Sequence, residues 1–206
     1  MAIVVAPIDR VEWARALPSV EAVRPARCPS CERVSKPVGR ELGLHGHGVR
    51  TRDLWGPPSP SAPPQLSELR VRRYRCVHCY SVCTVVPRGL LPRHMYTAGA
   101  IALALSLWSM GVAAGAVRTQ ISPWPLRGHA PGWRSLRRWT DRPRWPVPSL
   151  PLDRITRAAR IAGWLAAHAI GSAADLDVPV MAFDGAQRAR GRDPPPDDRI
   201  RSHHWG

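Results

Sequence analysis

Lysine is nearly absent from this chain: Lys36 is its single lysine, although Lys and Arg together number 30 against 15 acidic residues. The formal net charge of +15 is therefore carried almost entirely by arginine. A positive surplus of this size is typical of proteins that bind polyanions, and guanidinium groups suit paired hydrogen bonds to phosphate and guanine. The composition favours a nucleic acid as partner, although a GC-rich genome also enriches arginine, alanine, proline and glycine whatever the function.

Two further shortages concern the compartment. The first ten residues, MAIVVAPIDR, lack the basic segment and the long apolar run of a secretory signal, which favours a reducing cytoplasm. We expect a cytoplasmic protein associated with the nucleoid. Cysteine is scarce and odd in number, with five residues, which argues against a disulfide framework. In a reducing compartment, paired cysteines more often hold metal or do redox chemistry.

Motifs of the common enzyme classes are also missing. The sequence shows no Ser/His/Asp arrangement, no phosphate-binding glycine loop and no H-E-x-x-H helix. We therefore expect a protein that is not an enzyme, with no catalytic residues, no residues for an organic cofactor and no small-molecule substrate.

One long apolar stretch is present. Residues 95–117 carry no charge, which on length alone qualifies as a membrane span. Glycine and hydroxyl residues interrupt the stretch, alanine contributes little transfer free energy, and Arg93 and Arg118 flank it without charge asymmetry. We therefore favour a buried helix at 97–110 and a second helix from about Val112. A single-span membrane anchor is kept as a further alternative.

Four of the five cysteines form two C-x2-C pairs, CPSC at Cys28 and Cys31 and CVHC at Cys76 and Cys79. Each pair lets two thiolates point at one ion, and two pairs complete a tetrahedral zinc site. Such a site has no open position for substrate, so the predicted Zn2+ is structural. The alternatives are a redox pair or unrelated buried cysteines. Cys83 is expected to be a free buried thiol, with replacement of Cys79 as the other reading.

The order of these segments predicts an α+β fold, in which a small four-cysteine zinc ribbon precedes a helix-turn-helix region and a C-terminal helix. The predicted parts are a lead-in with a short helix capped by Asp9 (1–24), the zinc ribbon (25–91) with a proline-rich surface insertion (55–66), the helix-turn-helix region (92–141), a proline-rich linker (142–151), the C-terminal helix (152–175) and a mostly disordered tail (176–206).

The segment WRSLRRWTD, residues 133–141, separates two kinds of side chain around a helix. At about 100° per residue its two tryptophans and its leucine fall in one arc and its arginines in another. We predict a recognition helix, whose apolar arc packs while its arginines reach phosphate or guanine. An ordinary helix with a solvated basic face is the alternative. The candidate DNA-binding residues are Arg134, Arg137, Arg138, Arg118, Arg127, Arg72 and Arg73.

The order CPSC, HGHGVRTR, LRVRRYRCVHC and TVVPRGLLPRHMY, followed by a hydrophobic helix, SPWP and GWRSLRRW, covers about residues 25–141. It resembles short bacterial zinc-ribbon plus helix-turn-helix proteins related to insertion-sequence transposases. The resemblance implies Cys28, Cys31, Cys76 and Cys79 as zinc ligands and a DNA-binding module after them. Full transposases of this kind also carry a ribonuclease-H-like domain with three carboxylates, and we find none in the 65 residues after 141.

The predicted function is therefore a non-enzymatic protein of transposase-related origin that binds double-stranded DNA by sequence or by shape. Recognition of the ends of a mobile element and a regulatory role are both open, as is RNA in place of DNA. A homodimer or a transposase are the candidate protein partners. The alternative is a zinc-stabilised protein-interaction module whose helix at 97–108 docks on a partner.

Overall fold

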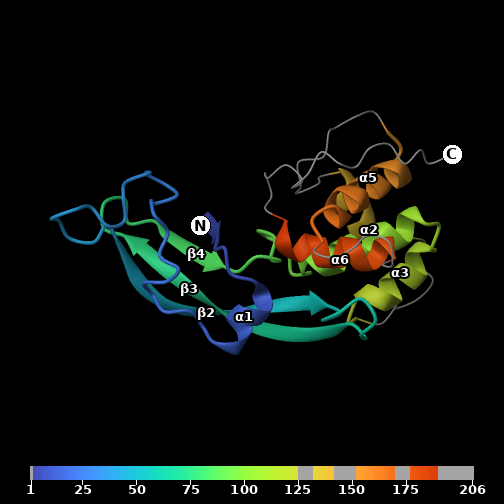
Figure 1. Ribbon diagram of the computed structural model, residues 1–206, viewed down its shortest axis with the longest axis horizontal. Coiled ribbons are helices and arrows are strands. Elements are labelled where there is room, and N and C mark those ends of the chain that lie inside the picture. The colour runs from blue at the N-terminus through green and yellow to red at the C-terminus, as the bar shows by residue number, and fades with distance from the viewer. Residues whose placement is uncertain (1, 125–131, 142–151, 170–176, 190–206) are drawn as a thin grey trace. The chain divides into compact units, whose positions relative to one another are not determined.

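The computed structural model describes residues 2–124, 132–141, 152–169 and 177–189. It contains one four-stranded sheet and six helices, which confirms the α+β class (Figure 1). Contacts divide the chain into a sheet unit, Met1–Leu54 with Leu66–Met95, and a helical unit, Trp55–Gln65 with Tyr96–Gly206. The chain thus passes between the two units three times.

The sheet has the strand order β1 (Ala2–Val5), β4 (Val82–Val86), β3 (Gln65–Cys76) and β2 (Leu44–Gly56). Strand β4 pairs in parallel with β1 and antiparallel with β3. The sequence analysis missed β1, because its four residues are too few to show an alternating pattern. Its β-branched side chains suit a strand only once β4 is there to pair with it.

A helix and an irregular segment cover one face of the sheet. Helix α1 (Arg10–Arg15) begins where we predicted it. The carboxylate of Asp9 accepts hydrogen bonds from the backbone amides of Val11 and Glu12 at 2.7 and 2.9 Å. Its Trp13 is 1% exposed, and the indole donates to the carbonyl of Arg70 at 2.8 Å. The hydroxyl of Tyr74 likewise donates to the carbonyl of Val20 at 2.6 Å. These bonds attach the N-terminal layer to β3.

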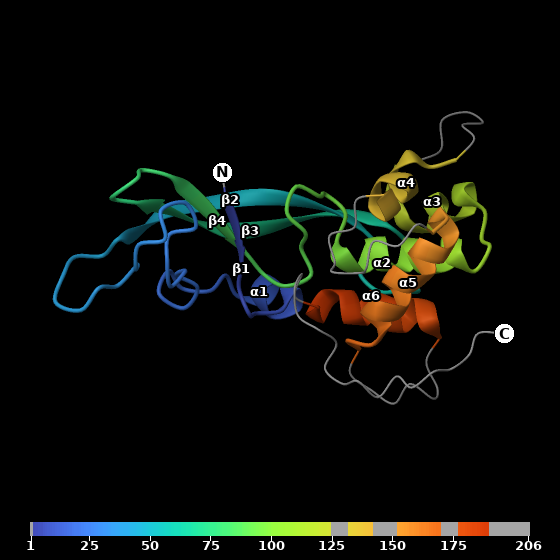
Figure 2. The ribbon, with the colours of Figure 1, turned by 90° about the horizontal axis from the view of Figure 1, so that it is seen from above.

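The helical unit is organised around α2 (Ala98–Ser109), which packs most extensively against α5 (Arg154–Ala166) and α6 (Val178–Arg188) (Figure 2). Helices α3 (Ala114–Ile121) and α4 (Arg134–Asp141) also contact α2. Every residue from Ala98 to Ser106 is buried, so α2 is the buried helix that we predicted and is covered on all sides like a central helix. Its small side chains allow close packing, and a Cβ at Gly99 would lie 2.9 Å from the ring of Phe183.

The apolar stretch at 95–117 is broken into two helices. Helix α2 ends at Ser109, Gly111 adopts a φ of +88°, and α3 begins at Ala114. Within the described residues, no helix has both the length and the apolar character needed to cross a membrane.

Two predicted segments differ from the structure. Helix α6 lies within residues 176–206, so the prediction of a mostly disordered tail was wrong for 178–188. The polar tail around it hid a short amphipathic pattern, in which Phe183 is buried. The predicted C-terminal helix, 152–175, ends at Ala166 and takes its N-terminal cap from Asp153. The linker at 142–151 and residues 190–206 lie outside the described residues.

The predicted proline-rich surface insertion, 55–66, is exposed or half-buried along most of its length, but it is buried where it begins. Gly56 and Pro57 are buried, and residues 55–65 belong to the helical unit. Gly56 adopts a φ of +122°, and a Cβ there would overlap the side chain of Ala100 on α2. Glycine is required at this position both by the backbone conformation and by the contact.

Candidate metal centre and arginine-rich helix

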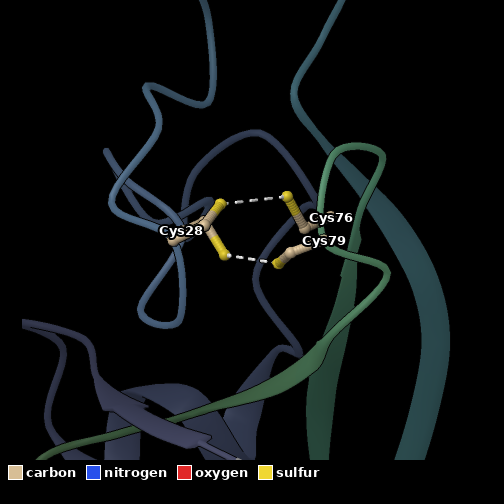
Figure 3. A group of neighbouring side chains, drawn as sticks. Cys28, Cys76 and Cys79 are labelled. Atoms are coloured by element: carbon tan, nitrogen blue, oxygen red, sulfur yellow. Dashed lines mark hydrogen bonds between the residues drawn. The ribbon is translucent and has the colours of Figure 1, made fainter.

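The four predicted ligands lie together in the sheet unit, and Figure 3 labels three of them, Cys28, Cys76 and Cys79. The sulfur atoms of Cys28, Cys31, Cys76 and Cys79 all lie within 4.8 Å of one another. Two pairs, Cys28 with Cys79 and Cys31 with Cys76, are 3.7 Å apart. The two C-x2-C segments are 44 residues apart in sequence, and β2 and β3 bring the second back to the first. The cysteines are positioned to hold a metal ion.

The spacing of the sulfurs distinguishes a metal site from a pair of disulfides. A disulfide needs a sulfur–sulfur distance of about 2.05 Å. A tetrahedral ion with metal–sulfur bonds of about 2.3 Å separates its sulfurs by about 3.8 Å. The two observed distances of 3.7 Å agree with the second case, and all the cysteines are free thiols.

The two C-x2-C segments share one backbone conformation. The amide of Glu32 donates to the carbonyl of Cys28 at 2.9 Å, and the amide of Tyr80 donates to that of Cys76 at 3.0 Å. Glu32 and Tyr80 each follow the second cysteine of a pair, and both are left-handed, with φ of 60° and 57°. A second backbone hydrogen bond also recurs in both turns. The amide of Cys28 donates to the carbonyl of Arg33 at 2.9 Å, and the amide of Cys76 donates to that of Ser81 at 3.0 Å. Residues other than glycine seldom adopt a positive φ. Its occurrence after both cysteine pairs indicates that the two turns have the same geometric requirement.

Hydrogen bonds make the cysteine thiols unequal in acidity. Burial raises the pKa of Cys28, but the amides of Cys31 and Ser30 and the Ser81 hydroxyl together lower it to about 6. The Ser81 hydroxyl also lies 3.0 Å from the sulfur of Cys79 and lowers that pKa. An amide hydrogen bond lowers the pKa of Cys31, yet burial and the neighbouring sulfurs raise it to about 12. A cation among the sulfurs would favour the ionised form of these thiols.

Cys83 stays outside this cluster, as we expected. It is 2% exposed in β4, in register with Tyr74 of β3. Burial, with a smaller contribution from Cys28, raises the pKa of Cys83 to about 11. It packs as a small apolar side chain, and the four-sulfur group forms without it.

No protein-family model, curated protein or solved structure matches this chain. The resemblance to transposase-related proteins therefore rests on the sequence motifs and stays an expectation. The chemistry of the chain is inferred below from its own geometry.

Helix α4 divides its side chains as its sequence predicted. Leu136 and Trp139 are buried, and Trp133 immediately before the helix is 9% exposed. Arg134, Arg137 and Arg138 are all exposed. Within the described part of the chain none of the three forms a salt bridge.

An aromatic cluster holds α4 in the helical unit. Its rings meet edge to face in a chain with centroid distances from 5.0 to 5.8 Å. The members of the cluster are Trp55, Tyr96, Trp124, Trp133 and Trp139. The sequence analysis missed this cluster because its members come from the end of β2, the segment before α2, the SPWP segment, and α4 with the residue before it. Only the spacing of Trp133 and Trp139 indicated any part of it.

Asp141 links α4 to α5. Its carboxylate accepts hydrogen bonds from Arg154 at 3.0 Å and from Arg157 at 3.4 Å. The hydrogen bond from Arg154 is the main cause that lowers the pKa of Asp141. The acidic side chain of α4 is thus engaged with α5, at the opposite end of the helix from Arg134.

The other candidate DNA contacts are distributed differently. Arg118 is half-buried on α3. Arg72 and Arg73 are half-buried in the sheet unit, and the Nε of Arg72 donates to the carbonyl of Pro18 at 2.8 Å. Arg72 therefore has a structural role, which the sequence did not indicate. Arg127 lies outside the described residues.

Proposed function

We propose that this protein binds DNA through α4 and that a structural zinc ion stabilises its sheet unit. The observation that carries the proposal is the exposed set Arg134, Arg137 and Arg138 on a helix whose other side is fixed by buried aromatic side chains. Among the residues that the structure describes, no salt bridge engages these arginines, which leaves their hydrogen-bond donors available to an outside anion.

The choice of zinc follows from the donor set. Four cysteine sulfurs in two C-x2-C segments are typical of structural zinc, whereas calcium and magnesium take oxygen ligands. Four thiolates on a dication leave a net charge of −2, and Arg27, Arg33 and Arg75 lie next to the ligands in sequence. The guanidinium of Arg27 donates to the carbonyl of Glu32, 3.1 Å away, beside the first pair of ligands.

The DNA proposal rests on the helix order α2, α3, α4, in which α3 and α4 both pack on α2. In a helix-turn-helix protein, a fixed helix of this kind offers its polar side to the major groove. Guanidinium groups suit phosphate and guanine equally. The resemblance of residues 25–141 to transposase-related proteins agrees with a DNA-binding role for α4.

A protein-interaction role for α2 has less support. The segment expected to dock on a partner is buried from Ala98 to Ser106 by helices of the same chain. An apolar face cannot serve a partner while α5 and α6 cover it.

Fluorescence anisotropy with a labelled DNA duplex, at several salt concentrations, tests the proposal. Replacing two arginines that contact phosphate should weaken binding and reduce the slope of log K against log salt by about 0.9 for each contact. The test variant is Arg134→Ala with Arg138→Ala, and the control of equal charge is Arg40→Ala with Arg160→Ala, both exposed. Binding that ignores salt, or that both double variants weaken equally, contradicts a role for α4. A duplex RNA competitor distinguishes the two nucleic acids.

A further inference from the structure

A cavity of about 370 Å3 lies in the sheet unit. Its floor includes Ile3, Val71 and Thr84, from three neighbouring strands. In the pairing of β1 with β4, Ile3 lies opposite Thr84, and the preceding residues, Ala2 and Cys83, lie opposite each other. Because successive side chains alternate between faces, the cavity occupies the face opposite the one that carries Cys83 and Tyr74. Its volume falls in the range that accommodates a small ligand.

The sides of the cavity are strongly basic. Arg50 and Arg52 of β2 line it together with Arg93 and His94, while Asp53 is the acidic residue among its lining side chains. Three arginines against one aspartate leave a charge of +2 with the histidine neutral. Arg50 and Arg93 are exposed and Arg52 is half-buried, so an anion can reach these guanidinium groups from solvent.

Arg52 fixes the segment that closes one side. Its guanidinium donates from one nitrogen to the carbonyls of Leu91 and His94, at 2.7 and 2.6 Å. Burial lowers the pKa of Arg52, and the charge of Arg50 lowers it further. Since a guanidinium stays protonated, an anion bound nearby would offset part of the cost of burying this charge.

The closing segment is a tight turn with an unusual residue. The amide of His94 donates to the carbonyl of Leu91 at 3.3 Å, which puts Pro92 and Arg93 at the two central positions. Proline suits the first of these positions, and the second favours glycine because its φ is positive. Arg93 adopts a φ of 62° there. Strained residues of this kind concentrate at binding sites, where the side chain has a use that glycine lacks.

We propose that this cavity binds a phosphate group, with Arg50 and Arg93 as its charged contacts and Arg52 as the residue that positions the turn. The site is independent of α4, so it goes beyond the function proposed above. The phosphate belongs either to a small phosphorylated molecule or to a nucleic-acid backbone, which are chemically alike at the point of contact.

Calorimetric titration with inorganic phosphate, at an ionic strength held constant with chloride, tests the site. Wild-type protein should show saturable binding in the millimolar range, and Arg50→Gln should weaken it at least tenfold. Arg93→Gly should do the same while the backbone strain is relieved, so weaker binding cannot be attributed to a damaged turn. Arg40→Gln, an equal change of charge at an exposed position away from the cavity, should alter binding less than twofold.

Absence of saturable binding in the wild type overturns the proposal, as does equal weakening by Arg40→Gln. The DNA titration described above identifies the source of the phosphate. If Arg50→Gln also weakens duplex binding, the site takes a backbone phosphate; if duplex binding is unchanged, it takes a small phosphorylated molecule. Failure of the α4 variants to affect DNA leaves the phosphate result standing, so the two proposals fail separately.

Discussion

In the helical unit, α2 is buried on all sides from Ala98 to Ser106, and four other helices contact it. In the sheet unit, the segment between α1 and β2 contains no helix or strand of its own, and one isolated bridge joins Arg27 to Val34. That segment carries the first two cysteines. The helical unit is held together by packing between its own helices. The sheet unit instead has a long irregular layer, which a metal ion bound by all four cysteines would connect to the turn between β3 and β4.

This difference shows where each unit is vulnerable. The metal ion proposed for the four cysteines would help to offset the entropy of ordering the irregular layer of the sheet unit. The helical unit instead depends on close approach between helices, which small side chains permit. Replacing a cysteine of the cluster should therefore destabilise the sheet unit, whereas enlarging a small side chain between helices should destabilise the helical unit.

The largest effect should come from Cys76→Ala. Structural zinc contributes roughly 10–16 kcal/mol in zinc-finger peptides, which is as large as the whole stability of an ordinary domain, about 5–15 kcal/mol. We expect loss of the metal and unfolding of the sheet unit. The measurements are metal content and the NMR signal of the Trp13 indole, which is hydrogen-bonded to the carbonyl of Arg70.

Cys83→Ala is the matched control, because Cys76 and Cys83 are 1% and 2% exposed and differ in whether they belong to the sulfur cluster. It should keep one equivalent of metal and lower the free energy of unfolding by about 1 kcal/mol through the lost sulfur. Loss of metal in this variant would show that the ligand set is wrong.

The second prediction concerns the contact between α5 and α6. A Cβ at Gly185 would overlap the carbonyl oxygen of Leu165, which is backbone and cannot rotate away. Gly185→Ala should force the helices apart and lower the free energy of unfolding of the helical unit by about 1–3 kcal/mol. Urea unfolding monitored by tryptophan fluorescence measures it.

Gly163→Ala on α5 makes the same change in open space, with nothing within 4 Å of the added Cβ. It should stabilise the helical unit by about 0.5–1 kcal/mol, because alanine has the higher helix propensity. Equal behaviour of the two variants would mean that α5 and α6 do not meet as closely as the structure shows.

A smaller gain is expected at the left-handed position of the first cysteine pair. Glu32→Gly removes an unfavourable backbone conformation beside the ligands and should strengthen metal binding by about 0.5–1 kcal/mol. Competition with a chelator measures the affinity. Ser30→Gly, between the same two cysteines, should give no such gain, and a gain of equal size there would remove the conformational explanation.

The smallest effect is expected for Asp141→Asn, because the Arg154 and Asp141 side chains are 49% and 39% exposed. The folded state holds the pKa of Asp141 below its ordinary value, so the ion pair stabilises the helical unit at neutral pH and stops doing so as pH falls through that lowered pKa. The substitution should reduce the free energy of unfolding by about 0.5 kcal/mol at pH 7. The difference between the two proteins should vanish in acid, and a difference independent of pH would contradict the ion pair.

Local signals in the sequence predicted a substantial part of this structure. Asp9 marks the start of α1, the two C-x2-C pairs predict the four cysteines that lie together, and the spacing from Trp133 to Trp139 predicts the two sides of α4. Each of these depends on residues close together in the chain, whose geometry a short pattern can specify.

Features that depend on distant segments were missed for the opposite reason. Strand β1 exists as a strand because β4 lies beside it. The cavity at Arg93 combines strands β1 to β4 with a turn. The prolines around Gly56 indicate a loop, but nothing local indicates that Ala100 packs against it.

The burial of Gly56 against Ala100 also determines how the gene can be divided. Because residues 55–65 belong to the helical unit, an expression fragment that begins at residue 96 lacks Trp55 of the aromatic cluster and the glycine that meets α2. A fragment that stops at residue 95 keeps the proline-rich residues 55–65 but lacks Ala100, against which Gly56 packs. A boundary at residue 95 or 96 therefore leaves each fragment without contacts that its residues make in the whole chain.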